Sequence, residues 1–185
     1  MMTGSGLFYL IGASGSGKDS VMRYTRQLLA GKGKVIFAHR YITRAQDPIG
    51  EAHVPLSEEE FEQRLQAGCF VMHWDSHGYR YGIGVEIEQW LDLGLKVVVN
   101  GSRAYLGEAQ KRYSQLQTVL IRVSPQQLRE RLIQRDRESA DEIDQRLQRA
   151  DDFDIQAQGG PRMHIIDNNG ALEQAGTQLI KLLSA

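Results

Sequence analysis

Residues 11–20, IGASGSGKDS, have the spacing of a phosphate-binding loop, in which Gly12 is followed after four residues by Gly17 and Lys18. A strand-like run, LFYLI, leads into the loop, and a helical segment, SVMRYTRQLLA, follows it. In such a loop, backbone N–H groups and the positive end of the helix dipole attract phosphate oxygens. We therefore expect a nucleoside triphosphate here. The residues expected to bind it are Gly12, Ala13, Ser14, Gly15, Ser16, Gly17, Lys18, Asp19 and Ser20.

Asp19 stands where phosphate loops normally carry Ser or Thr, whose hydroxyl binds the magnesium ion of the nucleotide. A carboxylate oxygen is also a hard ligand that magnesium accepts. We expect Asp19 to lie on the metal side of the site, bound to the ion directly or through water. Two alternatives stay open. Asp19 is a plain helix-start charge favoured by the dipole, or Ser20 serves the metal if the helix start is shifted by one residue.

Length, charge and cysteine content limit the classes of protein to which this chain can belong. A chain of 185 residues is long enough for one well-filled domain. Its 22 Lys and Arg against 23 Asp and Glu, a net charge of −1, argue against an unspecific nucleic-acid surface. Cys69 is the only cysteine, which excludes an intrachain disulfide and a cysteine metal cluster.

The chain shows no apolar run near the ~20 residues that a membrane span requires. Its opening residues, MMTGSG, lack the basic start and apolar core of a signal peptide. We expect a cytoplasmic protein whose partners are small molecules, not nucleic acid or membrane. The oligomeric state is left open.

Hydrophobic runs alternate with segments of helical period along the chain. The run at residues 7–12, and those at 95–100 and 117–123, are nearly continuous, as in strands buried on both faces. Alternating strands and helices predict one α/β domain, a parallel sheet flanked by helices. Strands are predicted at residues 7–12, 34–39, 95–100, 117–123 and 163–167.

Three sequence signals mark helix starts. Ser57 with Glu60 forms a possible capping box, and Gly68 is expected to stop that helix. Ser124 before Pro125 is typical of an N-cap with proline at the first helical position. A second possible capping box joins Ser139 to Glu142.

Two segments fit this alternation poorly. Residues 40–84 are polar and aromatic with a short helix inside, and residues 135–143, RDRESADEI, are densely charged. Ligands of open α/β sheets bind beyond the carboxyl ends of the strands, so insertions there are candidates for substrate cover. The alternative for the charged run is a solvated helix face.

Taken with YITR, LSEEEF, YRYGIG, VVVNGSR and RLIQRDRESADEIDQRL, the loop resembles that of a guanylate kinase, and the resemblance covers nearly the whole chain. It implies a P-loop nucleoside-monophosphate-kinase fold with one kinase domain, residues 1–185. The core would comprise residues 1–39 and 85–185. The acceptor-binding insertion would span about residues 40–84, and the lid about residues 135–143.

The same resemblance implies roles for individual residues. Arg44 and Tyr81 match an arginine and a tyrosine that hold the acceptor phosphate. Arg135 and Arg146 match two lid arginines that grip the transferring phosphoryl group, and with Lys18 they are the expected catalytic residues. Asn168, in IIDNNGAL, resembles the adenine-side loop.

Two departures from guanylate kinases fall on the residues that hold the base of the acceptor. Met72 stands at the guanine-reading glutamate, and Ile83 replaces a base-binding Ser or Thr. A site without the polar partners of a base loses on the order of 10⁴-fold discrimination for it. We therefore expect a poor guanine pocket. Other departures are Arg40 for a serine, Asn100 for an aspartate, loss of a second arginine near Asp47 and replacement of a tyrosine near His53.

GASGSGKDS, AHRYITR, YGIGVEI, VNGSR and VSPQQLRERL resemble more closely the ribose 1,5-bisphosphate phosphokinases of bacterial phosphonate degradation. This resemblance implies transfer of the ATP γ-phosphoryl group, with Mg²⁺, to the 1-phosphate of the sugar, giving 5-phosphoribosyl 1-diphosphate (PRPP) and ADP. An acceptor phosphate is already a nucleophile, so no general base is required. An acceptor with two phosphates and no base needs cations and hydroxyls, for which the candidates are Arg40, Arg44, Arg80, Tyr81 and Arg103.

Two kinds of alternative remain. One is a guanylate kinase or another kinase of small-molecule phosphates, and Met72 and Ile83 disfavour the guanylate kinase. The other is a guanylate-kinase-like module that binds phosphorylated peptides without catalysis. Such modules usually lack a competent phosphate loop and the lid arginines, whereas Lys18, Arg135 and Arg146 are all present here. We therefore expect an enzyme.

Overall fold

The computed structural model describes residues 6–45, 53–135, 140–151 and 160–185. Its central sheet has five parallel strands in the order β2-β7-β1-β8-β9. All five predicted strands are present, and the first and last have the predicted bounds. They are β1 (Leu7–Gly12), β2 (Val35–Phe37), β7 (Lys96–Asn100), β8 (Gln117–Arg122) and β9 (Met163–Asp167).

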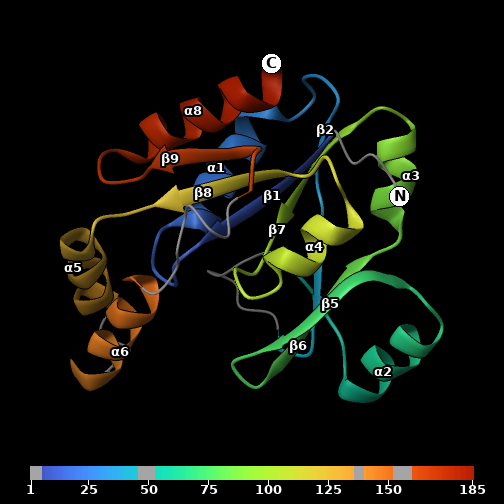
Figure 1. Ribbon diagram of the computed structural model, residues 1–185, viewed down its shortest axis with the longest axis horizontal. Coiled ribbons are helices and arrows are strands. Elements are labelled where there is room, and N and C mark those ends of the chain that lie inside the picture. Colours follow the sequence, from blue (N-terminus) through green and yellow to red (C-terminus); the bar gives the residue numbers. More distant parts are fainter. Residues whose placement is uncertain (1–5, 46–52, 136–139, 152–159) are drawn as a thin grey trace.

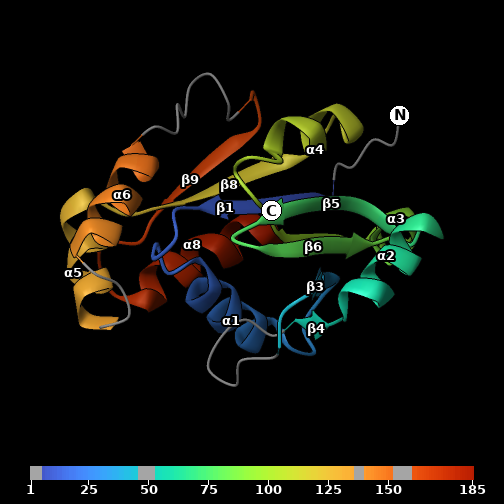
Figure 2. The same ribbon diagram turned by 90° about the horizontal axis from the view of Figure 1, so that it is seen from below.

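Helices cover both faces of this sheet, as the sequence predicts (Figures 1 and 2). On one face lie α1 (Lys18–Leu29) and α8 (Leu172–Ser184). On the other lie α3 (Glu86–Asp92) and α4 (Leu106–Arg112). The alternation of β1 explains its unbroken apolar run, because Phe8 and Leu10 pack toward α1 and α8 while Tyr9 and Ile11 pack toward the opposite cluster.

Beyond the carboxyl end of β8 the chain forms α5 (Pro125–Arg135) and α6 (Ala140–Asp151), which lie together at one side of the molecule (Figure 1). The predicted start of α5 is confirmed, since the Ser124 hydroxyl accepts a hydrogen bond from the Gln127 N–H at 3.3 Å. The predicted capping box at Ser139 lies outside the described residues.

Residues 40–84 contain a second, four-stranded sheet in the order β4-β3-β6-β5, which the sequence analysis missed. Only its helix, α2 (Glu58–Gln66), was expected. Ser57 caps α2 as predicted by accepting the Glu60 N–H at 3.1 Å, but the Glu60 carboxylate binds Arg64, so the box is half formed. The strands are β3 (Arg40–Ile42), β4 (Val54–Pro55), β5 (Phe70–Ser76) and β6 (Tyr79–Gly84).

The face of the second sheet opposite α2 joins the central core. Ile42, Trp74 and Ile83 share one apolar cluster with Tyr9 and Val99 of the central sheet. The insertion is therefore packed against the face of the central sheet that α3 and α4 also cover. Across the described residues, no helix has the length and apolar character needed to cross a bilayer.

Candidate active site

The phosphate loop connects β1, which ends at Gly12, to α1, which begins at Lys18. Its backbone requires glycine at two positions, since Gly15 has φ +91° and Gly17 has φ +81°. A Cβ atom on Gly17 would also lie 2.5 Å from Asn168 Nδ2. Gly17 caps α1 without a side-chain hydrogen bond. The first N–H groups of the helix are thus available to phosphate oxygens, which fits the expected nucleotide.

Two residues from other elements hold the loop in this shape. Asn168, which is buried after β9, donates from Nδ2 to the Ser16 carbonyl at 2.8 Å. Arg131 of α5 donates to the same carbonyl at 3.2 Å and to the Asn168 carbonyl at 2.6 Å. Asn168 therefore contacts the backbone of the phosphate loop, and its expected adenine-side role stays a prediction. Sequence reasoning missed Arg131, whose only signal was its place one helical turn before Arg135.

The side chains of Lys18, Asp19 and Asn100 contact one another. The Lys18 ammonium donates to Asn100 Oδ1 and lies 3.3 Å from Asp19 Oδ1. Asn100 Nδ2 donates to the same Asp19 oxygen at 2.9 Å. β1 and β7 are parallel neighbours with Leu10 opposite Asn100, so the register places this asparagine beside the loop. Since α1 begins at Lys18, Ser20 lies one residue further into the helix than Asp19.

Burial and neighbouring charges change the proton affinities of this set. Burial lowers the pKa of Lys18, and the nearby Asp19 carboxylate partly opposes this. Burial acts to raise the pKa of Asp19, but Lys18, Arg40 and hydrogen bonds from Lys18 and Asn100 outweigh it, and the pKa falls below its ordinary value. Asp19 is therefore a carboxylate at neutral pH. Its side chain is 56% exposed, so it remains accessible to an ion.

Arg40 and Tyr81 meet on the core-facing side of the second sheet. The Arg40 guanidinium carbon lies 5.0 Å from the centroid of the Tyr81 ring. Tyr81 in turn stacks on Trp74, with ring centroids 5.6 Å apart and planes 1° from parallel. Burial lowers the pKa of Arg40 to about 10, partly offset by the Asp19 carboxylate. Arg40 is thus charged at neutral pH, and from its place in the insertion its charge acts on Asp19 of the phosphate loop.

The row of residues beside Arg40 carries no polar group that could read a base. Strand pairing places Arg40 opposite Ile83, and Ile83 opposite Met72. Met72 and Ile83 are both 0% exposed and belong to the central apolar cluster. The two base-reading positions at which the sequence departs from guanylate kinases are therefore core residues here.

Arg44, two residues after β3, has a buried side-chain nitrogen. Within the described residues its Nε atom is buried and has no hydrogen-bond partner. Its guanidinium carbon lies 5.8 Å from the Tyr79 ring centroid. The backbone carbonyl of Arg44 is 3.0 Å from Nε2 of the buried His53. A buried donor without an acceptor is destabilising, so Arg44 is suited to an anionic ligand. Asp47 lies outside the described residues.

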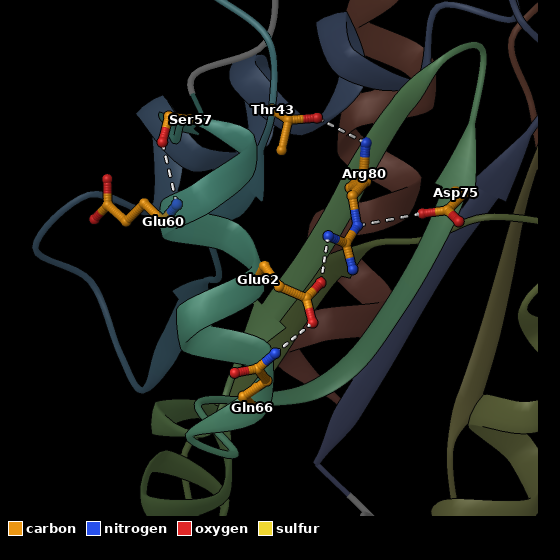
Figure 3. Close-up of polar contacts among 7 residues, drawn as sticks. All are labelled: Thr43, Ser57, Glu60, Glu62, Gln66, Asp75 and Arg80. Atoms are coloured by element: carbon orange, nitrogen blue, oxygen red, sulfur yellow. Dashed lines mark hydrogen bonds and ion pairs between the residues drawn. The ribbon is translucent and has the colours of Figure 1, made fainter.

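Arg80 does not join these residues, although the sequence analysis placed it with them. Its side chain is paired with Glu62 of α2 at 2.8 Å and lies 3.8 Å from Asp75, as Figure 3 shows. Its guanidinium carbon also lies 4.6 Å from the Phe61 ring centroid. Successive strand residues point to opposite faces, so Arg80 faces α2 while Tyr81 faces the core. The expected substrate contact of Arg80 is therefore not supported.

Arg103 follows the carboxyl end of β7, at the same edge of the sheet as the phosphate loop. Tyr9 fixes the loop that carries it, because its hydroxyl accepts the Ser102 N–H at 2.9 Å and lies 3.2 Å from the Ser102 carbonyl. The Arg103 side chain is half-buried.

Arg135 and Arg146 lie on α5 and α6, but their side chains are outside the described part of the structure.

The fold defines the class of protein. No family model matches the chain. Over 96% of the chain and 84% of its counterpart, the structure superposes on guanylate kinase from Anaplasma phagocytophilum with a TM-score of 0.68 at 15% identity. The fold is therefore guanylate-kinase-like, with a P-loop, as the sequence analysis expected.

Relatives with much closer sequences define the family. Ribose 1,5-bisphosphate phosphokinase PhnN of Thiobacillus denitrificans is 54% identical over 96% of this chain and 92% of its own. The proteins of that name from Psychromonas ingrahamii and Burkholderia pseudomallei are 51% and 47% identical, over 96% and 98% of this chain and 89% and 97% of their own. The chain belongs to the ribose 1,5-bisphosphate phosphokinase family, a family of kinases.

Proposed function

We propose that this protein transfers the γ-phosphoryl group of ATP to the 1-phosphate of ribose 1,5-bisphosphate, giving PRPP and ADP in phosphonate catabolism. The observation that carries the proposal is the acceptor side of the site. It offers Arg40 on the Tyr81 ring and the buried Nε of Arg44, which has no hydrogen-bond partner among the described residues, beside the wholly apolar Met72 and Ile83. Cations without a base-reading group suit a sugar bisphosphate. Family membership supports the same substrate.

The nucleotide half of the site suits ATP. The glycine backbone and the open N-terminus of α1 would hold the phosphates, and Lys18 would supply positive charge to them. In the described residues no cluster of three or more His, Cys, Asp or Glu could hold a metal. The exposed carboxylate of Asp19 would hold Mg²⁺ together with phosphate oxygens and water. When bound, the ion would neutralise charge on the transferring group.

The chemistry requires positioning and charge more than proton transfer. The 1-phosphate of the acceptor is already a nucleophile, so its oxygen attacks the γ-phosphorus and the bond to the ADP oxygen breaks. Arg40, Arg44 and Tyr81 would bind the acceptor phosphates, with Arg103 as a further candidate. Arg135 and Arg146, in a lid spanning about residues 135–143, would stabilise charge on the phosphoryl group in transit, together with Lys18. Residues 40–84 would form the acceptor-binding insertion of a cytoplasmic enzyme.

An acceptor panel tests this proposal. ADP release would be measured by a coupled assay with ribose 1,5-bisphosphate, GMP, AMP and gluconate, each at matched concentrations of enzyme and MgATP. We expect ribose 1,5-bisphosphate to give the highest kcat/KM. A higher value with GMP would make the protein a guanylate kinase. Absence of turnover with every acceptor would favour a binding module instead.

A further inference from the structure

We propose that Asn100 is a positioning residue that couples Lys18 to Asp19, so that this site works with one carboxylate at position 19 and an amide at position 100. The inference rests on the proposed binding of ATP by the phosphate loop. It concerns the nucleotide half of the site and does not depend on the identity of the acceptor.

Asn100 lies beside the start of the phosphate loop. It ends β7, directly opposite Leu10 of β1, at the point where the phosphate loop begins. The residue as a whole is 2% exposed, and the Lys18 side chain is 13% exposed. A buried amide that contacts both charged residues of the loop fixes where the two charges lie. It also shields the ammonium from water, so the Lys18 charge must be balanced locally.

The amide of Asn100 can both accept and donate hydrogen bonds. An ammonium only donates hydrogen bonds and a carboxylate only accepts them, so the two partners fix the orientation of the amide. Asn100 Oδ1 accepts from Lys18, and Asn100 Nδ2 donates to Asp19 at 2.9 Å. A carboxylate at position 100 could still accept from Lys18 but could not donate to Asp19. Two carboxylates would then face each other beside the triphosphate.

The contacts of Asp19 leave part of its carboxylate exposed. Lys18 and Asn100 both contact its Oδ1 atom, while 56% of the side chain is exposed. Arg40 adds a further favourable charge from the second sheet. Asn100 would thus orient Asp19 with part of the carboxylate open to a metal ion. The affinity for MgATP, relative to that for metal-free ATP, should depend on this orientation.

A double-mutant cycle tests the coupling. Calorimetry would measure the Kd of ATP with and without Mg²⁺, in the absence of any acceptor. The proteins are the parent, Asn100→Asp, Asp19→Asn and the double exchange Asp19→Asn with Asn100→Asp. In the double exchange, the amide at position 19 can donate to the carboxylate at position 100, and Lys18 can donate to it too. The contact pattern and the net charge are restored.

We expect Asn100→Asp to raise the Kd of MgATP at least about tenfold, the effect typical of a lost hydrogen bond to a charged group. Asp19→Asn should weaken MgATP binding and leave metal-free ATP unchanged or bound more tightly, because a negative charge beside the triphosphate is gone. The double exchange should bind MgATP severalfold more tightly than the product of the two single effects predicts, although less tightly than the parent, because its carboxylate lies at the buried position 100 and not at the exposed position 19. A double variant whose Kd is the product of the single effects, within about twofold, would overturn the coupling.

Asn169→Asp is the matched control, because it adds the same charge one residue beyond Asn168. Asn169 is exposed, and its Oδ1 accepts the Ser124 N–H at 2.7 Å, a bond that a carboxylate can keep. This variant should bind MgATP as the parent does. Thermal unfolding without nucleotide checks that all variants are folded. Parental MgATP affinity in a folded Asn100→Asp variant would also contradict the proposal. A parent that binds ATP but phosphorylates no sugar would contradict the proposed function alone.

Discussion

The guanidinium of Arg40 lies over the ring of Tyr81, with its carbon 5.0 Å from the ring centroid, and its charge also favours the ionised form of Asp19. Arg40 opens the first strand of the second sheet, yet its charge acts on the phosphate loop of the central sheet. One side chain thus connects the proposed acceptor site with the proposed nucleotide site. A cation there would draw two negatively charged substrates toward each other.

The first prediction concerns this connection. Arg40→Ala should lower kcat/KM for ribose 1,5-bisphosphate roughly ten- to a hundredfold, since it removes a charge-assisted contact. Arg40→Lys should recover only part of the loss, because an ammonium lacks the planar fork and stacks less well on Tyr81. Initial rates at varied acceptor and saturating MgATP measure both effects.

Arg80→Ala is the control for Arg40, since it removes an arginine from the neighbouring strand. Its partners are Glu62 and Asp75 on the far side of the sheet, so the acceptor kcat/KM should stay near the parental value. We expect only a small loss of stability, about 1 kcal/mol or less. A large loss of acceptor kcat/KM in this variant would show that Arg80 does contact the acceptor.

The second prediction concerns Arg44, whose buried Nε has no partner in the described residues. Arg44→Met keeps the side chain as far as the position of Nε, puts a methyl group there and removes the buried donor. The ligand-free protein should therefore be as stable as the parent or more stable, since an unsatisfied buried group is destabilising by about 1–3 kcal/mol. The kcat/KM for the acceptor should fall roughly ten- to a hundredfold, with ATP affinity little changed. Unfolding midpoints and acceptor kinetics together check both parts. An unchanged acceptor kcat/KM would show that residues 40–84 do not hold the acceptor.

The third prediction concerns the groups expected to act on the transferring phosphoryl group. Lys18→Ala should abolish most of the turnover in a folded protein. Arg135→Ala and Arg146→Ala should lower kcat far more than they weaken ATP binding, as expected for contacts that form mainly in the transition state. Steady-state kinetics and equilibrium binding of ATP separate the two effects. A change in KM alone would assign the arginines to ground-state binding.

The fourth prediction concerns the metal. If Asp19 holds Mg²⁺ or a water bound to it, Asp19→Asn should lose most activity at low Mg²⁺ and regain part of it at high Mg²⁺. Asp19→Thr should keep substantial activity, because a hydroxyl is the usual ligand at this position. The Mg²⁺ activation curves at fixed ATP are the measurement. A curve for Asp19→Asn that does not shift would leave Asp19 as a helix-start charge, worth about 0.3–1 kcal/mol of stability.

The central sheet could be predicted from sequence because its strands are buried on both faces and appear as continuous apolar runs, of which residues 7–12 are the clearest. The second sheet gave no such signal. Its strand β5 carries exposed His73 and Asp75 among buried residues, and β3 and β4 are only three and two residues long. The hairpin between β5 and β6 turns at His77 and Gly78, with φ of 52° and 75°, where Asn-Gly is the usual signal.

The residues of the site also divide into those that a local sequence pattern predicts and those that it does not. The phosphate loop is local in sequence, so Gly12 to Lys18 could be read from spacing alone. The contact of Asn100 with Lys18 and Asp19 depends on the register of β1 against β7, which no local pattern contains. The outward orientation of Arg80 follows from its neighbour Tyr81 facing the core, but this inference required β6 to be recognised as a strand.

The most direct test of the account is to identify the product made from MgATP and ribose 1,5-bisphosphate. Phosphorus NMR of the reaction mixture distinguishes a diphosphate on C1, whose two phosphorus nuclei are coupled, from a third separate monophosphate ester on the sugar. Transfer to the 1-phosphate predicts the two coupled resonances, an unchanged 5-phosphate resonance and an equal amount of ADP. Formation of a trisphosphate with no coupled pair beyond those of ADP and ATP, or loss of ATP without any change in the sugar, would contradict it.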